Sequence, residues 1–155
     1  MDVSTFGNIV LGIYGALLTT YTIIKSNQEK KPRLSVNLST GWRPALRDGQ
    51  LGPELLLITV TNLANRKATV NTPYLGLPDG KNLVTPIPLT NVRFPYRLEE
   101  EDNCAIWMEM NVVKNTLLKQ GYSGIVKLTG KVSDGIGRVF KSKKSWDFDV
   151  DKLYD

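Results

Sequence analysis

An uncharged run over residues 6–24, FGNIVLGIYGALLTTYTII, constrains this chain more than any other feature. About 19 helical residues rise roughly 29 Å, which is close to the thickness of the hydrocarbon core of a bilayer. The run therefore predicts a single N-terminal transmembrane helix. Two alternatives stay open. One is a cleaved signal peptide, which would normally begin with Lys or Arg and end at a small-residue cleavage site. The other is a buried helix of the domain that follows.

The charges on either side of the run predict its orientation. Asp2 is the only charged residue before Lys25, whereas basic residues follow the run closely. Basic flanks stay on the cytoplasmic side, so the sequence predicts a single-pass membrane protein whose C-terminal domain is cytoplasmic. The residues expected to contact lipid headgroups are Lys25, Lys30 and Lys31 and, from a turn of the domain, Arg66 and Lys67.

Small and polar residues recur along one face of this predicted helix. Such a stripe allows two membrane helices to approach closely and to form hydrogen bonds. It predicts self-association or docking onto a partner helix, although Gly and Thr are also ordinary residues in membrane helices. The predicted interface residues are Thr5, Asn8, Gly12, Gly15, Ala16, Thr19 and Thr22.

The composition excludes several kinds of chemistry. The chain has no His and a single Cys, Cys104. It therefore lacks the usual general base and the commonest metal ligand, and one thiol forms neither a zinc cage nor an intrachain disulfide. We expect no enzyme activity, no metal and no cofactor. The net charge of +5 is spread along the chain, so we expect membrane and protein partners and no nucleic-acid partner.

Residues 33–151 predict an all-β domain, because apolar residues alternate with polar ones between frequent turn signals. A change of period predicts one short helix over 111–120, with Asn111 as its N-cap and Gly121 as its stop. Three prolines make residues 86–97 extended and irregular. The predicted strands cover 33–40, 54–61, 67–77 with a break at Pro73, 82–85, 103–111, 122–132 and a last strand in two pieces, 139–142 and 145–150.

Seven short strands with one helix are typical of an Ig-like or fibronectin-III-like sandwich, with a small closed barrel as the alternative. The predicted organisation is a tail over 1–5, the transmembrane helix over 6–24, a polar linker over 25–32, the sandwich over 33–151 and a tail over 152–155.

The loop over 41–53 is long for a connection in a small domain, and long loops often carry function. Trp and Arg are frequent in binding hot spots. Trp42, Arg43 and Arg47 are therefore candidate surface-binding residues. The alternative is that Trp42 closes the end of the core.

Four stretches carry a resemblance to known proteins: ITVTNLANRKATV, YLGLPDGK, FPYRLEEED and VSDGIGRVFKS. Over roughly residues 33–150 the chain resembles small uncharacterised bacterial and phage-borne proteins that have an N-terminal membrane helix and an Ig-like β domain. It departs from them at Ala64, where a Gly often follows the Asn-x turn. The resemblance implies this architecture and no defined activity.

Together these features predict a non-enzymatic, single-pass membrane-anchored interaction or adaptor protein, which oligomerises through its helix or binds a protein partner. The alternative is a ligand-gated membrane effector whose β domain senses a small anionic signal.

Overall fold

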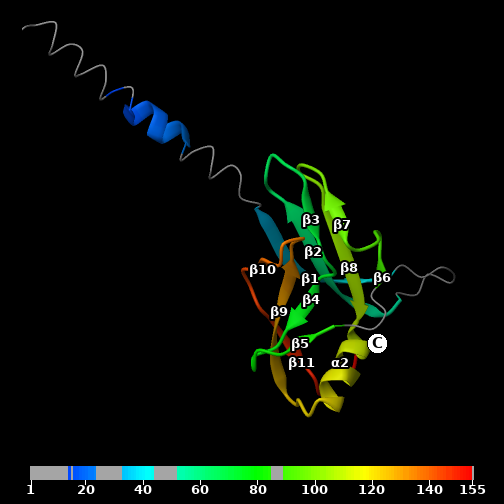
Figure 1. Cartoon of the computed structure of the whole chain (residues 1–155). Coiled ribbons are helices and arrows are strands. Elements are labelled where there is room, and N and C mark those ends of the chain that lie inside the picture. The colour runs from blue at the N-terminus through cyan, green and yellow to red at the C-terminus, as the bar shows by residue number, and fades with distance from the viewer. Residues whose placement is uncertain (1–13, 15, 24–32, 44–51, 85–88, 155) are drawn as a thin grey trace, which may run out of the picture. The chain divides into compact units, whose positions relative to one another are not determined.

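The computed structural model describes residues 14, 16–23, 33–43, 52–84 and 89–154 (Figure 1). The chain divides into two compact units, Met1–Pro32 and Arg33–Asp155. In the first unit, residue 14 and residues 16–23 are helical. The hydroxyls of Thr20 and Thr22 donate hydrogen bonds to the carbonyls of Ala16 and Leu18, one turn earlier in the same helix.

The predicted transmembrane helix over 6–24 is wrong, because the described part of the chain contains no helix that is both long and apolar enough to cross a membrane. The described run 16–23 rises only roughly 12 Å, and threonines at 19, 20 and 22 lower its apolarity. The same finding corrects the predictions of a single-pass membrane protein and of a cytoplasmic domain on the inner side of that membrane.

The described part of the second unit contains eleven strands and one helix, and the strands form three antiparallel sheets. The first sheet has the order β1 (Leu34–Trp42), β2 (Glu54–Asn62), β8 (Asn103–Glu109) and β6 (Leu89–Thr90). The second has the order β10 (Val139–Lys141), β9 (Ile125–Ser133), β4 (Tyr74–Gly76) and β5 (Asn82–Leu83), and β11 (Trp146–Asp149) also pairs with β9. The third consists of β3 (Ala68–Val70) and β7 (Tyr96–Leu98).

The prediction of a single seven-stranded Ig-like or fibronectin-III-like sandwich is therefore wrong. Pro73 divides the predicted third strand, since Pro has no N–H to give to a ladder. The two pieces then pair in different sheets, β3 with β7 and β4 with β5 and β9. The two predicted pieces of the last strand are separate strands, β10 and β11, which pair with successive parts of β9. The strands β6 and β7 lie within or beside the segment that was predicted to be irregular.

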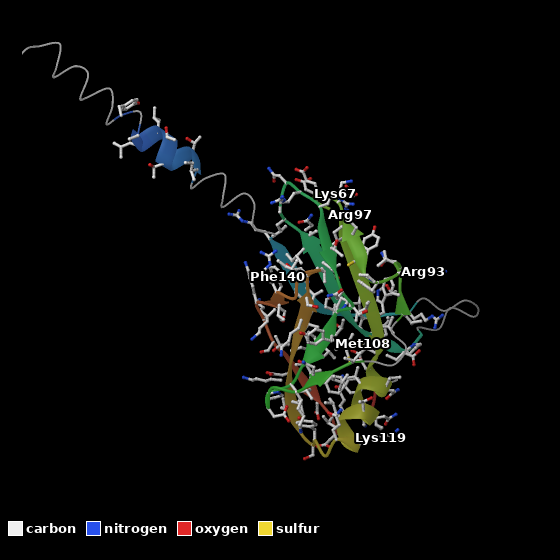
Figure 2. All side chains as sticks on the ribbon, in the orientation of Figure 1. Lys67, Arg93, Arg97, Met108, Lys119 and Phe140 are labelled. Carbon is white, nitrogen blue, oxygen red and sulfur yellow. The ribbon has the colours of Figure 1, made fainter. Side chains whose placement is uncertain are left out.

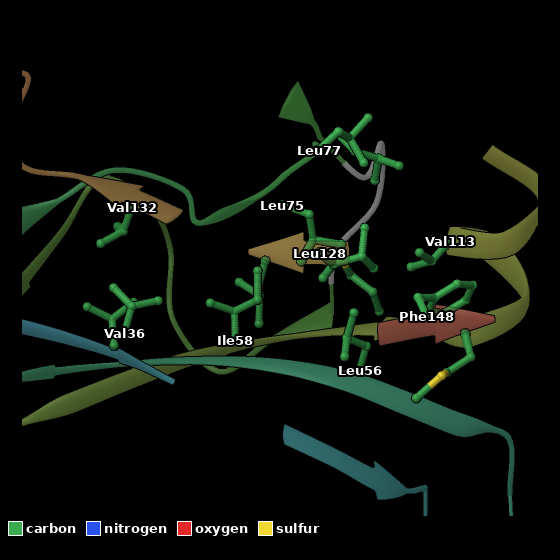
Figure 3. Close-up of a cluster of buried hydrophobic side chains, with 14 of the residues drawn as sticks. Val36, Leu56, Ile58, Leu75, Leu77, Val113, Leu128, Val132 and Phe148 are labelled. Carbon is green, nitrogen blue, oxygen red and sulfur yellow. The ribbon is translucent and has the colours of Figure 1, made fainter. Parts of the chain in front are cut away.

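The two larger sheets face each other across a shared apolar core. Figure 3 shows Val36 and Ile58 on one side of this core and Leu75 and Leu128 on the other. Gly130 of β9 lies close against the opposite sheet. A Cβ atom at Gly130 would lie 3.2 Å from both Val36 Cγ1 and Leu38 Cγ, so the absence of a side chain allows this approach.

Helix α2 (Met110–Lys119) follows β8 directly and buries Met110, Val113 and Leu117. It ends before Gly121, which has φ +84°, so the predicted stop is confirmed. The predicted N-cap at Asn111 is wrong, because Asn111 lies inside the helix. Its Nδ2 instead donates a hydrogen bond to the carbonyl of Tyr154 at 2.5 Å, which ties the end of the chain to α2.

We expect Gly130→Val to lower the free energy of unfolding by about 2–3 kcal/mol, because added methyl groups overpack the core against Val36 and Leu38. Urea unfolding followed by tryptophan fluorescence measures this loss. Lys127→Ala, at an exposed position of the same strand, is the control and should change stability by less than about 0.5 kcal/mol. Equal stability of the two variants would contradict the close approach at Gly130.

The turn after β9 contains a buried carboxylate, Asp134. It accepts hydrogen bonds from the backbone N–H groups of Ile136 at 3.1 Å and Arg138 at 2.8 Å, and from Arg138 Nε at 2.7 Å. Burial acts to raise the pKa of Asp134. The hydrogen bonds from Arg138 and Ile136 outweigh burial, so the pKa lies below its ordinary value of 3.8.

A depressed pKa in the folded state stabilises the protein above the ordinary pKa, and this contribution is lost as the pH falls through the folded-state pKa. We therefore expect Asp134→Asn to be less stable than the wild type at neutral pH, and the difference to shrink below about pH 4. Urea unfolding of both proteins between about pH 2.5 and pH 7 tests this. A difference that stays constant over the whole range would contradict the role of the ionised carboxylate.

Candidate interaction surface

Strand β1 forms one end of the four-stranded sheet and pairs with β2 on one side only (Figure 1). Within the described ranges, no strand pairs with its other side. β1 is nine residues long, LSVNLSTGW, and contains neither a charged residue nor a Pro. Sheet edges usually carry Lys, Pro or a bulge that prevents pairing with a further strand. As far as the described residues show, β1 is therefore an unprotected edge.

The register of β1 on β2 determines which backbone groups point toward the open side. The N–H of Leu63 donates to the carbonyl of Arg33 at 2.7 Å, and the N–H of Arg43 donates to the carbonyl of Pro53 at 3.3 Å. In an antiparallel pair, alternate residues bond to the same neighbour, so the odd-numbered residues of β1 bond to β2. The residues whose N–H and C=O groups point away from β2 are Leu34, Val36, Leu38, Thr40 and Trp42.

The two halves of β1 differ in exposure. Leu34 and Val36 are buried, and β1 contacts β9 and β10 of the opposite sheet. Leu38 and Thr40 are half-buried, and Trp42 is 57% exposed. The exposure of Trp42 shows that it does not close the end of the core. We call the backbone groups of Leu38, Thr40 and Trp42 that point away from β2 the open edge.

Arg43 extends the pairing beyond the end of β1. Its carbonyl accepts a hydrogen bond from the N–H of Gly52 at 2.8 Å, and a Cβ atom at Gly52 would lie only 2.5 Å from that carbonyl oxygen. Gly52 therefore allows the backbone of Arg43 to be held at this position. The Arg43 side chain is exposed, and no carboxylate in the described part of the chain forms an ion pair with it.

The outer face of the sheet is apolar beside the open edge. Gly41 contributes no side chain there, and a Cβ atom at Gly41 would lie 3.5 Å from Leu57 Cδ1. Leu57 of β2 lies opposite Trp107 of β8, which lies opposite Leu89 of β6. We call Leu57, Trp107 and Leu89 the apolar row. It crosses the sheet and ends opposite Ser39 of β1. Gly41 lies diagonally beside Leu57, and its own partner on β2 is the buried Leu55.

The turn that carries Arg66 and Lys67 is organised by a buried amide. Asn62 Nδ2 donates to the carbonyls of Arg66 at 2.7 Å and Glu99 at 2.8 Å, and Asn62 Oδ1 accepts from the N–H of Ala64 at 3.1 Å. Lys67 pairs with the Glu99 carboxylate at 2.8 Å. Figure 2 shows Lys67 at the end of the domain opposite to Lys119 of α2. The predicted lipid contact of this turn rested on a transmembrane helix that the described residues do not contain.

We expect Asn62→Ala to lower the free energy of unfolding by about 2–3 kcal/mol, because the buried N–H of Ala64 loses its acceptor and two part-buried carbonyls lose the Asn62 donor. Asn115→Ala, at an exposed position of α2, is the matched control and should be nearly neutral. Chemical unfolding of the two variants gives both values. A loss below about 0.5 kcal/mol for Asn62→Ala would mean that water replaces the amide at little cost.

Comparisons with known proteins assign no family. No protein-family model and no curated protein matches the chain. Among solved structures, the chain is similar to "X-ray structure of Northeast Structural Genomics Consortium target SoR45", with 14% sequence identity and a TM-score of 0.33, over 77% of this chain and 89% of that chain. A likeness at this level carries no argument about function. The resemblance to bacterial and phage-borne proteins stays a prediction.

The other predicted site residues fall into two groups. Ala16, Thr19 and Thr22 of the helical stripe are described, and all three are exposed. The predicted residues that lie outside the described ranges are Thr5, Asn8, Gly12, Gly15, Lys25, Lys30, Lys31 and Arg47.

Neither the Cys104 thiol nor the Asp79 carboxylate lies in surroundings that favour reactivity. Cys104 is buried, and burial together with the charge of Asp102 raises the pKa of its thiol to about 11, which disfavours a reactive thiolate. The Asp79 carboxylate accepts a hydrogen bond from Tyr122 at 2.5 Å and pairs with Lys81 at 3.0 Å, which lowers its pKa to about 2. In the described ranges, no cluster of three or more His, Cys, Asp or Glu residues could hold a metal ion.

The sequence analysis thus proposed Trp42 and Arg43 as binding residues, which stays a prediction, and it proposed neither the open edge nor the apolar row. A signal was present, since residues 34–42 alternate without a charge or a Pro. The sequence alone does not reveal that this strand lies at the end of its sheet.

Proposed function

We propose that this protein is an interaction module that binds an extended segment of a partner protein as an added strand on the open edge. The observation that supports this proposal is the uncharged, proline-free edge whose Leu38, Thr40 and Trp42 backbone groups point away from β2. In strand addition, main-chain hydrogen bonds supply affinity and alternate side chains supply specificity.

Trp42 and Arg43 lie at the more exposed end of this edge. Trp42 offers a large apolar surface to the incoming segment, and Arg43 offers a positive charge directly beside it. Both residue types are frequent in binding hot spots. The proposal thus retains the predicted non-enzymatic interaction function and omits the membrane anchor. The alternative of a ligand-gated membrane effector needed a spanning helix and is not retained.

The length of the open edge limits its affinity. Its three residues offer three N–H and three C=O groups, and each hydrogen bond contributes only about 0.5–1.5 kcal/mol net. Ordering the partner segment opposes this gain. We therefore expect dissociation constants of roughly 10–100 µM, which are typical of reversible recognition.

Replacing Thr40 by Pro tests the proposal. The N–H of Thr40 points away from β2, so Thr40→Pro removes a group of the open edge without removing a β1–β2 hydrogen bond. Random ten-residue peptides displayed on phage are selected on the full-length wild type, and selected peptides are then titrated against both proteins. We expect Thr40→Pro to weaken binding at least about tenfold, because a main-chain bond is lost and the ring obstructs the edge.

Thr40→Val is the matched control, since it keeps the backbone N–H and should bind as the wild type does. Thermal unfolding checks that both variants are folded. Amide hydrogen exchange should show added protection at Leu38, Thr40 and Trp42 when a selected peptide is bound. Equal binding by Thr40→Pro, or protection confined to other strands, would overturn the proposal.

A further inference from the structure

We infer that the open edge selects a segment with the order acidic residue, any residue, aromatic residue, and that this segment runs antiparallel to β1. The inference rests on the proposed function, because it assigns the partner sequence that strand addition at this edge would favour. It follows from three features of the surface: which side chains share the outer face, the charge of Arg43 and the missing side chain of Gly41.

The outer-face positions beside the open edge are Ser39, Gly41 and Arg43. Their backbone groups bond to β2, so they would form the non-hydrogen-bonded pairs with an incoming antiparallel strand. Opposite side chains are closest in such pairs. The residues of the partner opposite these three positions therefore determine specificity more than their neighbours do.

Arg43 selects the acidic residue. Both its backbone N–H and its carbonyl form hydrogen bonds on the β2 side, to Pro53 and from Gly52, so the position of its Cβ is fixed relative to the edge. Its side chain is exposed and has no carboxylate partner within the described residues. Opposite charges directly across a pair of strands attract, and like charges repel. A Glu or Asp opposite Arg43 is thus favoured over Lys.

Gly41 selects the aromatic residue. Gly41 has no side chain, and the apolar Leu57 lies diagonally beside it while Leu55 lies directly opposite it on β2. An aromatic side chain opposite a glycine covers the bare backbone and packs on apolar neighbours. Gly41 and Arg43 are two positions apart on one face, so the two favoured partner residues are also two positions apart.

The direction of the added strand determines their order. Every strand pair in this sheet is antiparallel, and antiparallel pairs are slightly more stable per residue than parallel pairs. In that direction, the partner residue opposite Arg43 precedes the one opposite Gly41. The acidic residue therefore comes first.

Synthetic eight-residue peptides test the inference on the full-length protein. The first is acetyl-SEVYVTVS-amide, which places Glu opposite Arg43 and Tyr opposite Gly41. Three peptides are compared with it by fluorescence anisotropy: SKVYVTVS reverses the charge, SVTVYVES reverses the order, and SVEYVTVS moves Glu to the other face. We expect SEVYVTVS to bind at least about fivefold more tightly than each of the three.

Two variants test whether Arg43 causes the preference for an acidic residue and Gly41 the preference for an aromatic residue. Arg43→Glu should reverse the charge preference, so that SKVYVTVS binds more tightly than SEVYVTVS. Gly41→Thr should remove the preference for Tyr over Thr at the aromatic position. A Cβ atom at Gly41 would make only ordinary contact with Leu57, at 3.5 Å, so this variant should fold. A thermal unfolding measurement on Gly41→Thr checks that the variant is folded.

The outcomes separate this inference from the proposed function. If peptides selected from the random library bind at the open edge but SEVYVTVS shows no advantage, the inference is overturned and strand addition stands. If SVTVYVES binds best, the strand runs parallel, and the inferred order is overturned. If no peptide binds and the chain instead self-associates in a manner that Thr40→Pro abolishes, the edge pairs with a second copy and both proposals fail.

Discussion

The register between β1 and β2 is the constraint on which the candidate surface depends. Side chains alternate between the faces of a strand, and backbone groups alternate between its edges, with the same period of two. One register therefore assigns Val36 to the core and the backbone groups of Thr40 to the open side. A shift by one residue would place Val36 in solvent and reverse the edge. Burial of Val36 against Gly130 thus keeps the open edge in position.

The same physics explains which elements the sequence could predict. Strands that bury one face against the core alternate regularly, so the predicted strands at 54–61, 103–111 and 122–132 correspond closely to β2, β8 and β9. The helix was predicted to within one residue at each end, because the period changes from two to about 3.6 and Gly121 adopts the positive φ that ends it. The alternation of a half-buried strand and the period of a helix depend on residues close together in the sequence, so the sequence shows both.

Features that depend on sheet order could not be read from the sequence. The pieces on either side of Pro73 look like one interrupted strand, yet they join different sheets. Trp42 and Arg43 were predicted from the composition of a loop, whereas the structure places them at the end of a strand that forms the edge of its sheet. Asn111 has the residue type of an N-cap, but it binds Tyr154 because the end of the chain packs there. In each case the local sequence allowed more than one structure, and a contact with a residue distant in the sequence determined which one forms.

The charges at the two ends of β1 distinguish a partner segment from a second copy of the chain. Antiparallel self-pairing along the full strand, with Leu38 opposite Leu38, would place Arg33 of each copy opposite Arg43 of the other. Like charges directly opposite destabilise a strand pair, and the uncharged residues between them offer no opposite charge that would offset this repulsion. A foreign strand with an acidic residue converts the repulsion at Arg43 into attraction. The edge is therefore open to an acidic segment while the full-length pairing of identical copies is disfavoured, so a long uncharged edge strand need not cause the edge-to-edge aggregation that such strands otherwise promote.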